Sequence, residues 1–274
     1  MKGLLIGALV FSTLTSSHVQ INGGSIVAFT STPSGLVMAA DSRSTHKIRP
    51  GLPDDNTCKI AAFKPNHVVF AATGLTSFVT NGDKNAPPGW NVIEDAKAAV
   101  IRKWDGPAPA TALDAVNVIS YQWEQITIRH WSDTLRLRPD LFNRVTADEA
   151  FKASGSVLTL GIFAIAYQGT VASVVSAIKY DNGSFSVSHP STGCTLMCVM
   201  GAGDVYSKHE DEWTMSPDQM GGADPMSRAI GVVKITISED QTGLVGGPVD
   251  ALELLNDGTI NWKQRKNNCP ESQD

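Results

Sequence analysis

Three side chains in the first quarter of the chain are suited to nucleophilic chemistry: Ser25, Asp41 and Lys59. A serine hydroxyl is a poor nucleophile at neutral pH, so it needs a base close by. A lysine ammonium next to that hydroxyl favours its ionised form, and a carboxylate can hold the ammonium by a charge-assisted hydrogen bond. The alternative is that Ser25 is only a strand residue and that Asp41 and Lys59 form an ordinary structural ion pair.

Each of these residues borders an apolar run that is typical of β-strands. Ser25 opens the run 25–31, and the turn 32–35 separates it from the apolar run 36–40, which ends at Asp41. This pattern predicts a β-hairpin with one buried arm. Lys59 opens a second pattern of the same kind, in which the turn 64–66 separates two apolar arms.

The rest of the chain alternates between groups of helices and groups of strands. Residues 132–156 mix charges, prolines and small residues, and we expect a connection there with at most one helical turn. Grouped elements favour an α+β layered fold over alternating βαβ units. The expected elements are helices at 90–104, 111–131 and 226–237, and strands at 157–167, 170–180, 184–188, 194–200, 249–255 and 259–262.

The segment 24–45 resembles the N-terminus of mature proteasome β-subunits. In that family a glycine precedes the nucleophile, a strand and a glycine-containing turn follow, and the next arm ends in the pentapeptide that stands here at 39–43, Ala-Ala-Asp-Ser-Arg. Lys59 at the start of a strand and the turn at Thr73-Gly74 match as well. The resemblance covers residues 24–262 and implies a four-layer α/β/β/α sandwich, the fold of N-terminal-nucleophile (Ntn) hydrolases.

The resemblance also implies a role for each site residue. The nucleophile is Ser25, sixteen residues before Asp41, and cleavage of the Gly24–Ser25 bond would free its α-amine as the base. The ordinary pKa of such an amine, about 7.7 to 8.0, suits proton transfer at neutral pH. Lys59 would lower the pKa of the amine and favour ionisation of the Ser25 hydroxyl, and Asp41 would hold Lys59 in place. A backbone N–H of Thr73 or Gly74 would stabilise the oxyanion.

The implied activity is cleavage of amide bonds by a peptidase or an amidase or acylase, with a peptide or small amide as substrate and with no cofactor or metal. The chain departs from the family in three places. It has Ser25 in place of threonine, Ala202 in place of a serine that supports the amine, and Val245-Gly246-Gly247 without the family's serine, with Asp240 about two residues too far away.

Two other readings of the chain therefore stay open. One is a catalytically inactive Ntn-like scaffold for binding or assembly, because a single gap would place Gly24 at the nucleophile position, as in inactive proteasome α-subunits. The other is a secreted binding protein unrelated to catalysis.

The composition is that of an ordinary globular protein, with 42% hydrophobic and 18% charged residues among 274. The net charge of −5 and the lack of a basic stripe argue against nucleic acid as a partner.

A short positive start and an apolar run at 3–11 resemble a secretory signal; the alternative is a propeptide or a first strand. We expect a leader at 1–24, an Ntn domain at 25–265 and a tail at 266–274. The mature protein would be exported to the periplasm or secreted, or else cytoplasmic, and free of the membrane.

Export would allow a local disulfide between Cys194 and Cys198. Their spacing lacks the second ligand pair of a zinc site, and the histidines are scattered singly. Tryptophans on the two expected helices belong either to the core or to a packing face between subunits. The second option leaves room for a homo-oligomer.

Overall fold

The computed structural model describes most of the chain. The residues that carry the signal-peptide prediction (1–19), together with Gly24, Cys194, Ala202 and the tail 267–274, lie outside the described ranges. The division of the chain at residues 24 and 265 therefore stays a prediction. The described residues are 20–23, 25–46, 55, 57–79, 88–102, 107–148, 151–152, 155–190, 197–201, 209, 224–241 and 243–266.

Two antiparallel five-stranded sheets form the centre of the molecule. The first contains β5 (Ile60–Phe63), β6 (Val68–Gly74), β9 (Val157–Tyr167), β10 (Thr170–Asp181) and β11 (Ser184–Ser188), in the order β11-β10-β9-β6-β5. The second contains β2 (Ile26–Thr32), β3 (Gly35–Ala40), β12 (Cys198–Gly201), β13 (Asp250–Leu255) and β14 (Ile260–Gln264), in the order β12-β2-β3-β13-β14. Both predicted hairpins are present, and the turn of the second is a short 3₁₀ helix, Lys64–Asn66.

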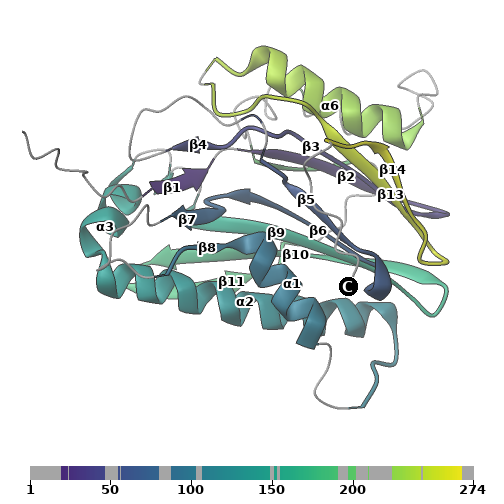
Figure 1. Ribbon diagram of the computed structural model, residues 1–274, viewed down its shortest axis with the longest axis horizontal. Coiled ribbons are helices and arrows are strands. Elements are labelled where there is room, and N and C mark those ends of the chain that lie inside the picture. Colours follow the sequence, from purple (N-terminus) through teal and green to yellow (C-terminus); the bar gives the residue numbers. More distant parts are fainter. Residues whose placement is uncertain are drawn as a thin grey trace, which may run out of the picture.

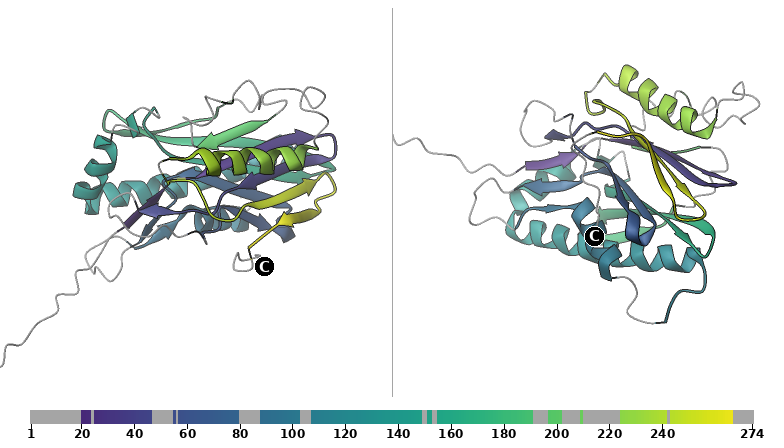
Figure 2. Two further views of the ribbon diagram at one scale, coloured as in Figure 1. Left: turned by 90° about the horizontal axis from the view of Figure 1, so that it is seen from above. Right: turned by 45° about the vertical axis from the view of Figure 1, so that its right-hand side comes forward.

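Helices cover the outer face of each sheet. Helices α1 (Val92–Arg102) and α2 (Ala112–Leu137) lie on the first sheet, and α6 (Pro225–Glu239) lies on the second (Figure 1). Seen from above, α6 lies over the strands of the second sheet (Figure 2). The predicted four-layer α/β/β/α sandwich is therefore confirmed. None of the helices in the described part of the chain is long and apolar enough to cross a membrane.

The expectation of a mere connection at 132–156 was wrong. Helix α2 continues to Leu137, and α3 (Pro139–Ala147) follows after one residue. Proline fits the first turn of a helix, where its missing N–H is not needed, so Pro139 starts a helix here. Phe142 is fully buried, and its ring lies 6.0 Å from that of Trp131 and 4.6 Å from that of Tyr180. This tertiary packing outweighs the polar composition of the segment.

Three apolar clusters fill the spaces between the four layers. The first, between the helices and the first sheet, includes Trp123 and Trp131. These two tryptophans therefore belong to the core and not to a packing face between subunits. In the second sheet, Val27 faces the space between the sheets, whereas Ile26 and Ala28 face α6. Strand β2 is thus buried on both faces, which explains why its sequence is almost continuously apolar.

A small four-stranded sheet lies beside the start of β2. It contains β1 (Gln20–Gly23), β4 (Thr45–His46), β7 (Ser77–Val79) and β8 (Trp90–Asn91), in the order β4-β1-β7-β8. Residues 20–22 pair antiparallel with β7, and residues 22–23 pair antiparallel with β4. The backbone that precedes Ser25 is therefore held between two segments that come from later in the chain.

A pair of glycine substitutions tests the packing of α2 on the first sheet. A Cβ at Gly161 would lie 2.6 Å from Trp123 Cη2 and 3.0 Å from Phe70 Cε2, whereas one at Gly231 in α6 would meet nothing within 4 Å. We expect Gly161→Ala to lower the free energy of unfolding by about 1–3 kcal/mol through overpacking. Gly231→Ala should raise it by about 0.5–1 kcal/mol, because alanine loses less backbone entropy than glycine in a helix. Urea unfolding measures both, and equal midpoints for the two variants would contradict the packing described here.

Candidate active site

The hydroxyl of Ser25 and the ammonium of Lys59 are in direct contact. Lys59 Nζ donates a hydrogen bond to Ser25 Oγ over 2.5 Å, and the two residues are only 2% and 4% exposed. Ser25 immediately precedes β2 in the second sheet, and Lys59 immediately precedes β5 in the first, so the contact spans the two sheets. A positive donor at this distance stabilises negative charge on the serine oxygen, which is what a serine nucleophile requires.

Asp41 lies at the end of β3 and binds backbone amides. Its Oδ1 accepts a hydrogen bond from the N–H of Ile26 at 2.9 Å, and its Oδ2 accepts from the N–H groups of Arg43 and Gly246, both at 3.1 Å. The predicted direct bond to Lys59 is corrected here, because the contacts of Asp41 within the described chain include no hydrogen bond or ion pair with Lys59. The amides of these three residues occupy both carboxylate oxygens instead.

Burial dominates the electrostatics of Asp41. Removal from water raises the pKa of its carboxyl above the ordinary value of 3.8, while the charge of Lys59 and the three backbone hydrogen bonds act in the opposite direction. Lys59 therefore acts on Asp41 through space. Because Asp41 binds the amide of Ile26, it fixes the backbone directly after Ser25.

Gly201 closes the site from the side of β12. It pairs with Ile26 in β2, and its φ of +84° is one that residues other than glycine rarely adopt. A Cβ at this position would overlap the carbonyl oxygen of Ser25. Only glycine therefore allows β12 to come this close to the candidate nucleophile, and the neighbouring Ala202 lies outside the described residues.

The two predicted oxyanion residues end strand β6. The amide of Ala72 donates to the carbonyl of Lys59 over 3.4 Å, so Thr73 and Gly74 directly follow a residue that is bonded to Lys59. Gly74 has a φ of +83°, and a Cβ there would lie 2.6 Å from the carbonyl oxygen of Leu158. The Oγ1 of Thr73 is buried and has no hydrogen-bond partner in the described part of the chain. The oxyanion role of these amides stays a prediction.

A small cavity, with room for about one water molecule, adjoins Lys59 on the side of helix α1. Its walls are mostly small or β-branched side chains, together with the first turn of the helix. Lys59 thus borders this cavity and also contacts Ser25. The lining residues are Thr57, Cys58, Lys59, Ala72, Thr76, Asn91, Val92 and Ile93.

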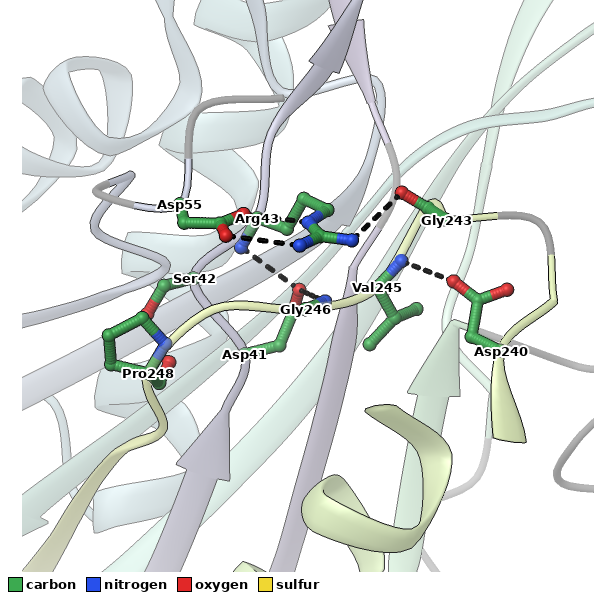
Figure 3. Close-up of polar contacts among 9 residues, drawn as sticks. All are labelled: Asp41, Ser42, Arg43, Asp55, Asp240, Gly243, Val245, Gly246 and Pro248. Atoms are coloured by element: carbon green, nitrogen blue, oxygen red, sulfur yellow. Dashed lines mark hydrogen bonds and ion pairs between the residues drawn. The ribbon is translucent and has the colours of Figure 1, made fainter. Parts of the chain in front are cut away.

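An ion pair holds the segment that supplies the Gly246 amide. Arg43 Nε donates to Asp55 Oδ1 at 2.6 Å and its Nη2 donates to Oδ2 at 3.0 Å, while Nη1 reaches the carbonyl of Gly243 at 3.5 Å (Figure 3). The hydrogen bond to Arg43 is the main reason why the pKa of Asp55 lies below its ordinary value. Asp240 accepts from the N–H of Val245 at 2.6 Å. The sequence offered Arg43 in its matched pentapeptide, but no signal pointed to Asp55.

Both described cysteines, Cys58 and Cys198, are disulfide-bonded. The predicted pairing of Cys198 with Cys194 stays a prediction, because Cys194 lies outside the described residues. Within those residues, no group of three or more His, Cys, Asp or Glu side chains is arranged to hold a metal ion.

Comparisons with known proteins give structural neighbours only. No protein-family model matches the chain, and no curated protein matches it. Among solved structures, it is similar to a Gly-1 mutant of Anbu from Hyphomicrobium sp. strain MC1, with a TM-score of 0.49 and 14% identity over 90% of this chain and 89% of that one. It is also similar to Anbu, described as an ancestral beta-subunit, from Yersinia bercovieri, with a TM-score of 0.48 and 14% identity over 86% of both chains. The candidate site therefore rests on its own geometry.

Proposed function

We propose that this protein is a self-processed N-terminal-serine hydrolase that cleaves amide bonds, with peptides as its substrates. The observation that carries the proposal is the buried 2.5 Å hydrogen bond from the Lys59 ammonium to the Ser25 hydroxyl. A buried lysine is costly unless its charge is used or paired. Here it lies against a hydroxyl at the end of a central strand, next to a cavity.

Processing would begin with attack of Ser25 Oγ on the carbonyl carbon of Gly24. The new C–O bond forms as the C–N bond breaks, and the hydroxyl proton ends on the Ser25 nitrogen, which leaves an ester. Water then hydrolyses the ester, releasing the leader with a free carboxylate and restoring the hydroxyl. Lys59 stabilises the serine oxygen while the proton leaves.

Turnover would repeat the same chemistry on a substrate. The freed α-amine of Ser25 takes the hydroxyl proton, and Oγ attacks the substrate carbonyl to give an acyl-enzyme. The amides of Thr73 and Gly74 would stabilise the oxyanion, the amine returns the proton to the leaving nitrogen, and water releases the acyl group.

Strand β1 favours peptides over small amides as substrates. Its backbone fills a position between β4 and β7 immediately before the scissile bond. Once the leader has left, an extended peptide could pair with the same two strands, as in other cases of strand addition.

A catalytically inactive scaffold is the second candidate. Val245 favours it, because this residue stands near the family's second serine position and its side chain is buried in the apolar cluster beneath α6. The position thus contributes to packing and not to a polar network around the amine.

Export is part of the proposal as well. Disulfides persist in oxidising compartments and are rare in the cytosol, so the bonded state of Cys58 and Cys198 favours a periplasmic or secreted protein. Self-association remains part of the proposal, since Leu113 and Tyr121 lie exposed on the outer side of α2.

The identity of the nucleophile can be tested by replacing it. We expect wild-type protein to begin at Ser25 and Ser25→Ala to keep the leader attached, because the alanine variant lacks the attacking oxygen. Intact mass and N-terminal sequencing distinguish the two products. Ser31→Ala, at an exposed position of the same strand, is the matched control and should process normally. A terminus upstream of Ser25 in both wild type and variant would favour the scaffold.

The pH dependence of processing should report the ionisation of Asp41. Because burial raises the pKa of its carboxyl above 3.8, Asp41 becomes protonated at a higher pH than an ordinary aspartate as the solution is acidified. A protonated carboxyl is a weaker acceptor for the Ile26 amide, so processing should slow with an acid limb above pH 3.8. Asp41→Asn should be slow at every pH and lack this limb. Circular dichroism at each pH checks that the protein stays folded, and a rate that is constant down to pH 3.8 would contradict the assignment.

The redox state of the cysteines tests the export proposal. In protein purified without reductant and then denatured, Cys58 and Cys198 should resist alkylation, because both are in disulfides. After reduction both should label completely, and peptide mapping by mass spectrometry reads out each residue. Labelling of either residue before reduction would argue for a reducing compartment.

A further inference from the structure

The ion pair between Arg43 and Asp55 lies against the chain segment that completes the Asp41 site. Two parallel hydrogen bonds, of 2.6 and 3.0 Å, join the guanidinium to the carboxylate, and a third contact of 3.5 Å joins Arg43 to the carbonyl of Gly243. Bidentate pairs of this kind fix the plane of the guanidinium as well as its position. Arg43 is therefore held in one orientation beside residues 243–247 (Figure 3).

Two consecutive glycines pack directly on this ion pair. A Cβ at Gly246 would overlap the guanidinium, with Arg43 Nε only 2.6 Å away. A Cβ at Gly247 would lie 3.0 Å from the Cβ of Asp55, and Gly247 has a φ of +75°. The backbone of this segment thus lies as close to the ion pair as a chain without side chains allows.

The segment that packs on the ion pair is the one that reaches Asp41. The N–H of Gly246 donates to Asp41 Oδ2 at 3.1 Å, and its carbonyl accepts from the N–H of Ser42 at 3.0 Å. Ser42 also donates from its hydroxyl to the carbonyl of Pro248. Among the described residues, three amides donate to the buried carboxylate, and Gly246 supplies one of them, so its position affects the ionisation of Asp41.

We propose that the Arg43–Asp55 ion pair is a positioning clamp, which holds the Gly246 amide on Asp41 and so keeps the Ser25 site competent. The proposal rests on the function proposed above. Asp55 acts here through Arg43 and Gly246, and neither Asp55 nor Arg43 takes part in bond making or breaking.

The clamp should matter more for the chemistry of the site than for stability. Arg43 and Asp55 are 24% and 41% exposed, and ion pairs with this much solvent contact contribute little to folding. Loss of a hydrogen bond to a buried carboxylate, in contrast, makes its ionised form harder to keep. The charged groups that face this region are Lys59, Arg43, Asp55, Asp240 and Lys266.

The experiment compares Asp55→Asn with a matched control elsewhere. Arg138 and Asp140 form a bidentate pair of similar geometry, with hydrogen bonds of 3.1 and 3.0 Å and exposures of 22% and 52%, on the opposite layer of the fold. Asp140→Asn therefore removes an equivalent ion pair without touching the site. The probe is the full chain, and the readouts are the rate of Gly24–Ser25 cleavage from pH 4 to 8 and the thermal unfolding temperature.

We expect Asp55→Asn to slow cleavage by about ten- to a hundredfold, the effect of losing one hydrogen bond to a charged group. Its acid limb should move to higher pH, while Asp140→Asn leaves both the rate and the limb unchanged. Asp55→Glu, which keeps the carboxylate, should retain more of the rate than Asp55→Asn. If Asp55→Asn does not fold, Arg43→Lys takes its place, because lysine keeps the charge but loses the bidentate geometry.

Three results would overturn the proposal. A wild-type rate and an unshifted acid limb in Asp55→Asn would exclude the clamp, and a block in Ser25→Ala would show in the same experiment that the hydrolase proposal still holds. Equal slowing in Asp55→Asn and Asp140→Asn would mean that the effect comes from stability alone. A Ser25→Ala variant that processes like wild type would remove both the clamp and the proposed function.

Discussion

A single buried carboxylate organises the end of the sandwich where the candidate site lies. Asp41 is completely buried, and a charge in that position is tolerated only with several donors around it. The donors come from the start of β2, from the residues after β3 and from the glycine segment after α6. One side chain therefore joins three parts of the second sheet and its connections. Ser25 directly precedes the first donor, Ile26. The hydrogen bond that Asp41 accepts from the Ile26 amide therefore also fixes the position of Ser25.

The layers around this carboxylate explain why the neighbouring sequences are so apolar and so rich in glycine. Strand β2 packs between the other sheet on one face and α6 on the other, which leaves few places for polar side chains except at its ends. Ser25 and Asp41 stand at such ends, directly before β2 and directly after β3. Gly201 and Gly246 then let backbone approach the site more closely than any residue with a Cβ would allow. Close backbone contact takes the place of the polar side chains that a looser site would need.

Local patterns were enough to predict the hairpins, most helices and the layered fold, because apolar periodicity and turn residues act over a few positions. The resemblance to proteasome β-subunits, and not these local patterns, implied that Ser25 and Lys59 share a site. The local patterns failed at α3, where packing of Phe142 on residues far along the chain decides the structure. The resemblance did not indicate the hydrogen-bond partners of Asp41, because these are backbone amides, which almost any residue type can supply. The role of Asp55 could not be predicted for a related reason, because it depends on Arg43, which only the fold places beside it.

The small sheet adds a consequence that goes beyond the cut itself. Strand β1 is an inner strand, bonded on both sides, so breaking the peptide bond after it would not by itself set it free. The cleaved leader would stay hydrogen-bonded to β4 and β7 until thermal motion breaks this strand pairing. Dissociation of this strand would then limit the rate at which the site opens, and dilution and denaturant would change that rate. During maturation, some molecules would be cleaved while the leader still covers the site.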